Sequence, residues 1–350
     1  MQPVVLGPNQ PRQFYKGGSA IAALRGSDEQ TEFGPEDWVA SATGRFGLGD
    51  DGLSRLPDGR YLRDVIEADP VQWLGPDHVG YFGADPALLV KLLDAGQRLP
   101  VHVHPDRSFA VRHLGSRHGK TEAWVVLGTE GTQPAVYLGW QRDVEPAELS
   151  RWVAEQDTVA MLGRMHKLGV AAGDTVLVPA GTVHAIGEGV FSLELQEPTD
   201  FSVMLEVKGF DIDPARGYVG LDRELAISCV NSRSLNDREV DALRTRTTTS
   251  GAVAVEDVLA EAAKPYFRAQ RVSGGEGVSL EASFAVVVAT SGDGLVSGEG
   301  WQLRLRRGTT MVVPWGAGGT KVEGRVELFR CLPPLPADAA KDDPGAAPRQ

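Results

Sequence analysis

Hydrophobic residues occur mainly in short runs that are separated by turn residues. Val- and Leu-rich runs at residues 88–93, 99–104, 175–178, 191–196 and 201–207 have the length of β-strands. Residues 20–24 and 38–42 have similar character, and residues 122–127 and 135–138 are expected to form a hairpin. Many of the 42 Gly and 22 Pro residues lie between such runs. This pattern predicts a mainly β fold with tight turns.

A few segments show helical spacing instead. Residues 61–68, 70–74, 221–230 and 238–244 are expected to form short helices. Between residues 143 and 168, Leu149, Trp152, Val153, Gln156 and Val159 recur every three or four positions. We therefore expect a helical insertion at about 143–168 within the β domain.

The second half of the chain again predicts short strands, at residues 266–272, 284–289, 301–305, 310–313 and 326–331. The polar run 245–251 is a candidate linker, so we expect one domain at 1–244 and a second at 252–332. Residues 333–350, rich in Pro, Ala and Asp, are expected to form a disordered tail.

One segment of the first domain resembles a segment of the second. Gly173-Asp-Thr-Val-Leu-Val-Pro-Ala-Gly181 is similar to Gly308-Thr-Thr-Met-Val-Val-Pro-Trp-Gly316. The similarity favours two copies of one β-barrel unit. The alternative is that a strand between glycine turns is simply common in β proteins.

Composition excludes several classes of protein. The chain has 35 Lys+Arg against 47 Asp+Glu, a net charge of −12, which argues against nucleic-acid binding. Only two Cys occur, so a disulfide framework or a Cys-rich metal site is excluded. There is no apolar run of about 20 residues and no basic segment followed by an apolar one at the start. We expect a cytoplasmic protein that does not bind membranes.

Histidine supplies the clearest candidate chemistry. His102 and His104 are two residues apart in a predicted strand, so both imidazoles project from one face. Glu122 opens a later strand, and His184 follows a Pro-Ala-Gly turn at the start of another. Three His and one carboxylate form a plausible four-ligand site for a divalent metal. The pair of His alone would also fit a solvent-facing strand.

The second unit offers no equivalent ligands. Gly319 stands where His184 would fall, and no His occurs after His184. If there are two barrels, we expect only the first to bind metal.

Two further residues suggest a polar cavity. Glu194 lies on the polar face of a strand whose other face is apolar, and a carboxylate there could transfer protons. Lys91 interrupts an apolar run, so its ammonium either extends to solvent or faces a polar cavity. An ordinary two-faced strand is the alternative for Glu194.

Five motifs, taken in order, resemble the type I mannose-6-phosphate isomerase family. They are Leu89-Val-Lys-Leu-Leu-Asp-Ala95, His102-Val-His-Pro-Asp106, Lys120-Thr-Glu122-Ala-Trp, Val178-Pro-Ala-Gly-Thr-Val-His-Ala-Ile-Gly187 and Glu194-Leu-Gln-Glu. The match extends from about Gly17-Gly18 and Pro35-Glu-Asp-Trp38 to about Asp200, and the second half is only loosely similar.

The resemblance implies a cupin barrel (a double-stranded β-helix) with a helical insertion and a second, metal-free cupin-like barrel. It implies one zinc ion bound by His102, His104, Glu122 and His184. The implied reaction interconverts mannose 6-phosphate and fructose 6-phosphate through a cis-enediol. The resemblance places four further residues in the pocket as candidate catalytic groups: Lys91, Lys120, Glu194 and Asp200. The implied partner is a small sugar or sugar phosphate.

The sequence departs from the family at two positions linked to anion recognition. The family usually has Arg four residues after the position of Asp200, and Ser two residues before the first metal ligand. This chain has Met204 and Pro100 there. Lys208, Arg107 or Arg112 are candidates to take over the anion.

These departures leave other functions open. The chain could act on a free or differently substituted sugar, or be a non-catalytic sugar-binding or regulatory cupin. A cupin dioxygenase is disfavoured, because such enzymes place the Glu ligand only a few residues after the paired His, whereas Glu122 is 18 residues after His104.

Overall fold

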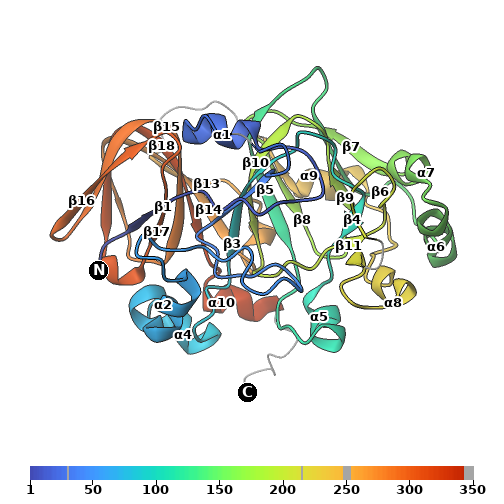
Figure 1. Ribbon diagram of the computed structural model, residues 1–350, viewed down its shortest axis with the longest axis horizontal. Helices are drawn as coiled ribbons and strands as arrows, with labels where there is room; N and C mark the ends of the chain where they lie inside the picture. The colour runs from blue at the N-terminus through green and yellow to red at the C-terminus, as the bar shows by residue number, and fades with distance from the viewer. Residues whose placement is uncertain (30, 214–215, 247–253, 343–350) are drawn as a thin grey trace.

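The computed structural model describes residues 1–350 except 30, 214–215, 247–253 and 343–350. Within this part of the chain, three antiparallel sheets form two β units that lie side by side along the long axis of the molecule (Figure 1). The predicted linker at 245–251 falls mostly outside the described residues. No helix in the described part is long and apolar enough to span a bilayer.

The first unit consists of a six-stranded and a five-stranded sheet. The six-stranded sheet has the order β12 (Arg244–Thr245), β8 (Thr175–Val178), β5 (Glu122–Thr129), β10 (Val190–Gln196), β3 (Leu89–Asp94) and β2 (Glu36–Val39). The five-stranded sheet has the order β11 (Val203–Met204), β4 (His102–Val103), β9 (His184–Ile186), β6 (Ala135–Trp140) and β7 (Met165–Gly169).

The second unit is a seven-stranded sheet. Its order is β1 (Val4–Leu6), β17 (Thr310–Val313), β15 (Ala285–Gly298), β18 (Thr320–Leu332), β14 (Arg268–Leu280) and β13 (Val255–Asp257), and β16 (Trp301–Arg306) pairs with β15. Strand β1 comes from the start of the chain but pairs with β17, with Val4 opposite Val312. In Figure 1 this blue strand lies among the orange ones.

Short helices cover the ends of both units. They are α1 (Ser19–Arg25), α2 (Leu62–Ala68), α3 (Pro70–Leu74), α4 (Pro76–Phe82), α5 (Arg107–His113), α6 (Pro146–Glu155), α7 (Thr158–Gly163), α8 (Arg223–Ile227), α9 (Asp237–Ala242) and α10 (Pro336–Ala339). The expected insertion contains α6 and α7, which lie at the end of the molecule farthest from the second unit (Figure 1). In the expected tail, α10 is ordered and buries Ala339.

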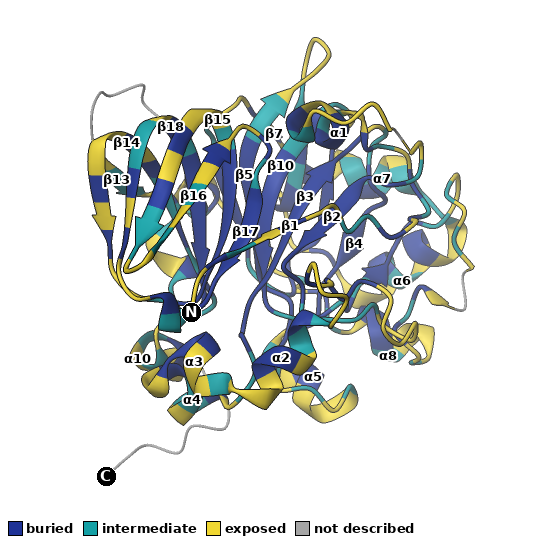
Figure 2. Ribbon diagram, turned by 60° about the vertical axis from the view of Figure 1, so that its left-hand side comes forward, coloured by how far each residue is buried: buried dark blue, intermediate teal, exposed yellow. Residues whose placement is uncertain are grey.

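The six-stranded sheet separates two apolar cores. On its inner face, Trp124 and Val176 pack against Val136, Leu138 and Ile186 of the five-stranded sheet. Its outer face packs against the second unit, as the continuous buried layer between them shows (Figure 2).

Strand β10 illustrates this division between the two faces. Leu193 and Leu195 belong to the core shared with Val288 and Phe329 of the second unit. Glu194, between the two leucines, lines the cavity inside the first unit. Because strand side chains alternate, one β10 face builds the interface and the other builds the cavity.

The two similar glycine-bounded segments form equivalent strands. Val176 of β8 and Met311 of β17 face the interior of their own units. Their neighbours Leu177 and Val312 face the shared core between the units. The similarity in sequence is therefore matched by the orientation of both strands.

Two predictions of secondary structure are wrong. Residues 20–24, expected as a strand, lie in helix α1, whose first turn is stabilised by hydrogen bonds from the amides of Gly18 and Ala20 to the Asp94 carboxylate. This tertiary contact is invisible in the local pattern. Residues 122–127 and 135–138 are both strands but do not form a hairpin: β5 pairs with β8 and β10, whereas β6 pairs with β7 and β9. The connection crosses from one sheet to the other.

Candidate active site

Three of the predicted metal ligands meet inside the first unit. His102 on β4 lies directly opposite His184 on β9, and their ring centroids are 4.1 Å apart. His104, just after β4, places its ring 5.0 Å from that of His102 and 4.7 Å from that of His184. All three side chains are buried, and their potential ligand atoms lie within 4.8 Å of one another.

Each imidazole is oriented by a hydrogen bond from Nδ1 to a backbone carbonyl. The acceptors are Pro100 for His102, Phe201 for His104 and Thr182 for His184, each at 2.8 Å. A carbonyl oxygen only accepts, so Nδ1 carries the proton and Nε2 keeps its lone pair. Metal-ligating histidines are typically held in this way.

Glu122 completes the cluster from the first residue of β5. Its Oε2 lies 3.0 Å from Nε2 of His104, and its Oε1 lies 3.3 Å from Nε2 of His184. Both Nε2 atoms are buried and make no hydrogen bond. A lone pair facing a carboxylate at this distance is unfavourable unless a cation lies between them. The four side chains therefore fit a divalent metal ion.

The charge states of the ligands suit a cation. Burial and the nearby Lys120 ammonium lower the pKa of His104 to about 3. Burial also holds the pKa of His102 well below its usual value. Burial opposes ionisation of Glu122, but the nearby Lys120 ammonium helps to keep its pKa well below the usual range. His102 and His104 are thus neutral imidazoles beside an ionised carboxylate.

The predicted Pro-Gly turn places the start of β9. Gly181 has a φ of 83° and donates its amide to the His104 carbonyl at 2.7 Å. Thr182 donates its amide to the Pro179 carbonyl at 3.0 Å, which closes the turn. A side chain at Gly181 would require a strained backbone, so glycine is needed to bring β9 next to His104.

A cavity of about 560 Å³ opens over these ligands. Its lining includes His102 and Glu122 and all four predicted catalytic residues, namely Lys91, Lys120, Glu194 and Asp200. This volume is within the usual range for small-molecule sites. The structure thus brings every predicted site residue to one place.

Glu194 and Asp200 are buried carboxyl groups in this cavity. Burial, together with the charge of Glu122, raises the pKa of Glu194 to about 8, although Lys91 opposes the shift. Burial also raises the pKa of Asp200, whose Oδ2 accepts a 3.1 Å hydrogen bond from the Phe46 amide. Glu194 is therefore poised to exchange protons near neutral pH.

Both lysines are held among carboxylates. Lys120 places Nζ 3.7 Å from Oε2 of Glu122 and 3.3 Å from the Ser202 hydroxyl. Lys91, opposite Glu194 in the β3–β10 register, places Nζ 3.3 Å from Oε2 of Glu36. Burial alone would lower the pKa of Lys91, but Glu36 and the other carboxylates raise it above its usual value.

Glu36 and Tyr15 belong to the site but were not singled out from the sequence. The Tyr15 hydroxyl and the Trp38 indole N–H donate to the Glu36 carboxylate at 2.6 and 2.7 Å. These bonds and the Lys91 ammonium outweigh burial and lower the pKa of Glu36 to about 2. The Pro35-Glu-Asp-Trp38 motif contains Glu36, but in the sequence it supports only the family resemblance and assigns Glu36 no role.

The suggested replacements for the missing family Arg lie elsewhere. Lys208, Arg107 and Arg112 do not line the cavity, and Arg107 instead bonds Glu197 at 2.7 Å. Pro100 and Met204 do line it, and so do Arg12, Arg45 and Arg216. Arg12 and Arg45 come from a turn-rich segment without apolar periodicity, which explains why the pattern of the sequence did not single them out.

The remaining histidines are not part of the metal cluster. His118 contacts the Asp85 carboxylate at 2.6 Å, and His78 bonds the Asp85 carbonyl at 2.7 Å. His166 lies in β7 and bonds the Leu235 carbonyl at 2.8 Å. Their roles are local and structural.

The chain is similar to known isomerases in sequence. A mannose-6-phosphate isomerase of Bacillus subtilis is 31% identical over 249 residues, which cover 69% of this chain and 73% of that protein. The mannose-6-phosphate isomerase of Streptococcus mutans is 27% identical over 339 residues, covering 94% and 97% of the two chains. No family model matches the sequence.

The fold agrees with this similarity. A crystal structure of mannose 6-phosphate isomerase from Bacillus subtilis superposes with a TM-score of 0.69 at 22% identity, covering 95% of this chain and 99% of that one. This likeness and the sheet topology confirm the predicted mainly β cupin fold. The chain therefore belongs to the mannose-6-phosphate isomerase family and is an aldose–ketose isomerase.

Proposed function

We propose that this protein interconverts mannose 6-phosphate and fructose 6-phosphate through a cis-enediol. The observation that carries the proposal is the cluster of three oriented imidazoles and Glu122 at a cavity that also holds Lys91 and Glu194. Relatives named mannose-6-phosphate isomerase support the choice of substrate.

We propose zinc as the metal, held by His102, His104, Glu122 and His184. Imidazole and carboxylate ligands suit Zn²⁺, and His ligands that donate Nδ1–H to carbonyls are fixed in the ligating tautomer. When bound, the ion would act as a Lewis acid toward the sugar oxygen atoms next to the reacting carbons.

Glu194 is our candidate for the proton-transfer group. It would remove the proton from C2 of the open-chain aldose as the C1 oxygen gains one, which gives the enediol. It would then return a proton to C1 while the C2 oxygen loses its own, which gives the ketose. Its pKa of about 8 keeps proton uptake and release both accessible near neutral pH.

The other cavity residues would position the sugar. The Lys91 ammonium, fixed by Glu36, supplies a cation opposite Glu194, and Lys120 supplies another beside Glu122. Asp200 can accept hydroxyl hydrogens of the sugar while its backbone contact to Phe46 holds it in place. These contacts would orient C1 and C2 toward the proton-transfer group.

Exchange with solvent tests the proposal. Zinc-loaded protein in D₂O would be incubated with mannose 6-phosphate and, separately, with free mannose, and followed by proton NMR. We expect fructose 6-phosphate to form with deuterium entering at the transferred carbon. Conversion of free mannose alone would instead support an isomerase of unphosphorylated sugars. No exchange with any sugar, in protein with one metal per chain, would favour a binding or regulatory role.

A further inference from the structure

Two arginines from the N-terminal segment face the cavity where the expected anion-binding groups are missing. Arg12 and Arg45 line the same cavity as Pro100 and Met204. Proline has no side-chain donor, and methionine carries no charge. The arginines supply what these two positions lack, from a different part of the chain.

Arg45 is fixed in place yet keeps donors free. Its Nη1 donates to the Arg12 carbonyl at 3.1 Å and to Asp51 at 2.8 Å, and its Nη2 donates to the Gln13 side chain at 3.1 Å. A guanidinium has five N–H groups, so Nε–H and one N–H of Nη2 remain for a ligand. The Arg45 side chain is only 16% exposed and already ordered, so it loses little conformational freedom when a ligand binds.

Arg12 is held by an aromatic ring and not by a carboxylate of the described residues. Within the described residues it makes no salt bridge, and its guanidinium lies over the Phe33 ring, 4.5 Å from the centroid. Stacking on an aromatic ring leaves the edge of the guanidinium open to an anion.

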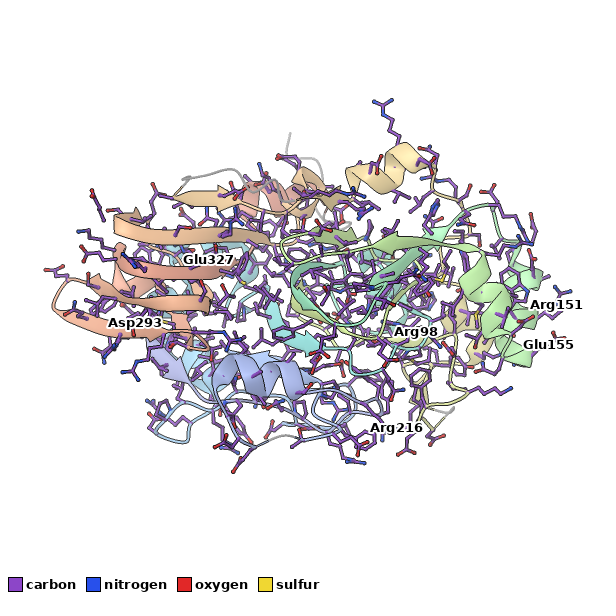
Figure 3. The ribbon with its side chains drawn as sticks, turned by 90° about the horizontal axis from the view of Figure 1, so that it is seen from above. Arg98, Arg151, Glu155, Arg216, Asp293 and Glu327 are labelled. Atoms are coloured by element: carbon purple, nitrogen blue, oxygen red, sulfur yellow. The ribbon has the colours of Figure 1, made fainter. Side chains whose placement is uncertain are left out.

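A third arginine, Arg216, lines the cavity from another segment and is labelled in Figure 3. Asp211 and Asp213 of the same segment also line the cavity. Arg12 and Arg45 are linked by the hydrogen bond from Arg45 to the Arg12 carbonyl, so we take this pair, rather than the single Arg216, as the candidates for binding an anion.

The loop that carries Arg45 is attached directly to the reacting part of the cavity. The next residue, Phe46, donates its amide to Asp200 at 3.1 Å and packs its ring against that of Phe201, 5.4 Å away. The Phe201 carbonyl in turn accepts the Nδ1–H of His104. An anion bound at Arg45 would thus lie in the same cavity as the metal ligands.

We propose that Arg12 and Arg45 bind the phosphate group of the substrate, and so determine the preference for a phosphorylated over a free sugar. The inference rests on the proposed function, because it assigns the phosphate of that substrate. Guanidinium groups match phosphate oxygens with paired N–H donors, and a phosphate monoester is largely dianionic at neutral pH.

Steady-state kinetics with matched variants tests the assignment. We would compare zinc-loaded wild type, Arg12→Gln, Arg45→Gln and the double variant on mannose 6-phosphate and on free mannose. Binding of inorganic phosphate would be measured by calorimetry at fixed ionic strength. Arg60→Gln is the control, because it removes the same charge at an exposed site paired with Asp58 and outside the cavity lining.

We expect the double variant to raise KM for mannose 6-phosphate by about 10- to 100-fold and to weaken phosphate binding similarly. Activity on free mannose, kcat on the phosphate ester, metal content and the melting temperature should change little. Two single variants should give intermediate KM values. Arg12→Gln removes a guanidinium that stacks on Phe33 and makes no side-chain hydrogen bond to another described residue, so it should leave the loop in place. Arg45→Lys keeps the positive charge but loses the paired N–H donors of the guanidinium.

The outcomes separate this inference from the proposed function. KM and phosphate affinity within twofold of wild type in the double variant would overturn the assignment while the isomerase activity stands. A parallel loss of activity on free mannose would also overturn it, because the arginines would then support the fold. If wild type isomerises no sugar but binds phosphate through these arginines, the anion site stands and the proposed function fails.

Discussion

The two β units share an architecture but differ in what their strands turn inward. In the first unit, inward positions on three neighbouring strands carry Lys91, Glu122 and Glu194, which line a cavity of about 560 Å³. In the second, apolar side chains such as Val287 and Met311 fill the interior, and the cavity that they line has a volume of about 10 Å³. The alternation of faces is the same, so the identity of the inward residues decides whether a barrel becomes a site or a core.

The difference has an energetic side. Burying a charged side chain is unfavourable unless the charge is paired or neutralised. The first unit pairs Lys91 with Glu36 and Glu122 with Lys120, whereas the pKa of Glu194 rises to about 8 and favours its neutral form. The second unit instead buries apolar groups on both faces, one inside and one against the first unit. The second unit thus supplies stabilisation to a neighbour that uses its own interior for chemistry.

The largest test of this comparison removes one of the proposed metal ligands from the first unit. We expect His184→Ala to lose the metal and to lower turnover by at least about 1,000-fold. The reason is that only three of the four proposed ligands, Glu122 among them, would remain to hold the ion. Metal content by mass spectrometry and turnover measure the effect. His113→Ala, at an exposed position on α5, should change neither. One metal per chain in His184→Ala would refute the site.

The next test keeps the metal and removes the proton-transfer group. Glu194→Gln should lower kcat by about 100- to 10,000-fold, the usual contribution of a general acid–base group, while metal content stays unchanged. Glu323→Gln, on β18 of the second unit and paired with Lys321, is the matched control and should be silent. Unchanged proton exchange at C2 in Glu194→Gln would assign the transfer to another residue.

A third test enlarges the small cavity inside the second unit. Leu328→Ala, at a buried position of its interior, should lower the free energy of unfolding by about 2–5 kcal/mol. Urea unfolding measures this loss. Under native conditions we expect metal content and KM to stay close to those of wild type, since the site lies in the other unit. A loss of metal in the folded variant would mean that the two interiors are coupled.

The smallest expected effect depends on pH and concerns a charged pair that anchors a loop of the first unit. Burial opposes charge on His118, but Asp85 and Glu197 raise its pKa to about 9. The folded-state pKa exceeds the ordinary value near 6.5, so the stabilisation is complete below about pH 6.5 and is lost as pH rises through 9. We expect His118→Gln to lower the free energy of unfolding by about 1–3 kcal/mol at pH 6 and by much less at pH 9.5. An equal loss of unfolding free energy at pH 6 and pH 9.5 would show that the stabilisation does not depend on the ionisation of His118.

The sequence predicted most of the site because its residues sit in local patterns. Alternation placed His102 and His104 on one face, and the Pro-Gly turn placed His184 at the start of a strand, as the structure shows. The family resemblance, which rests on five motifs in order, then implied Lys91, Lys120 and Asp200, and these residues share the cavity.

What the sequence did not predict depends on contacts between distant segments. Helix α1 is held by a hydrogen bond to the Asp94 carboxylate. Arg45 is oriented by hydrogen bonds to Asp51 and Gln13. Strand β1 pairs with β17, about 300 residues later in the sequence. Propensity and periodicity describe neighbours in sequence, so none of these pairings leaves a local signal.

The pairing of β1 with β17 has a consequence for how the chain matures on the ribosome. Val4 is synthesised long before its partner Val312, which emerges only after both sheets of the first unit have been made. Until then β1 has no partner, and β17 would be an open sheet edge in any chain that lacked the start. The seven-stranded sheet is thus closed by a contact of very high sequence separation, the kind that forms late in folding.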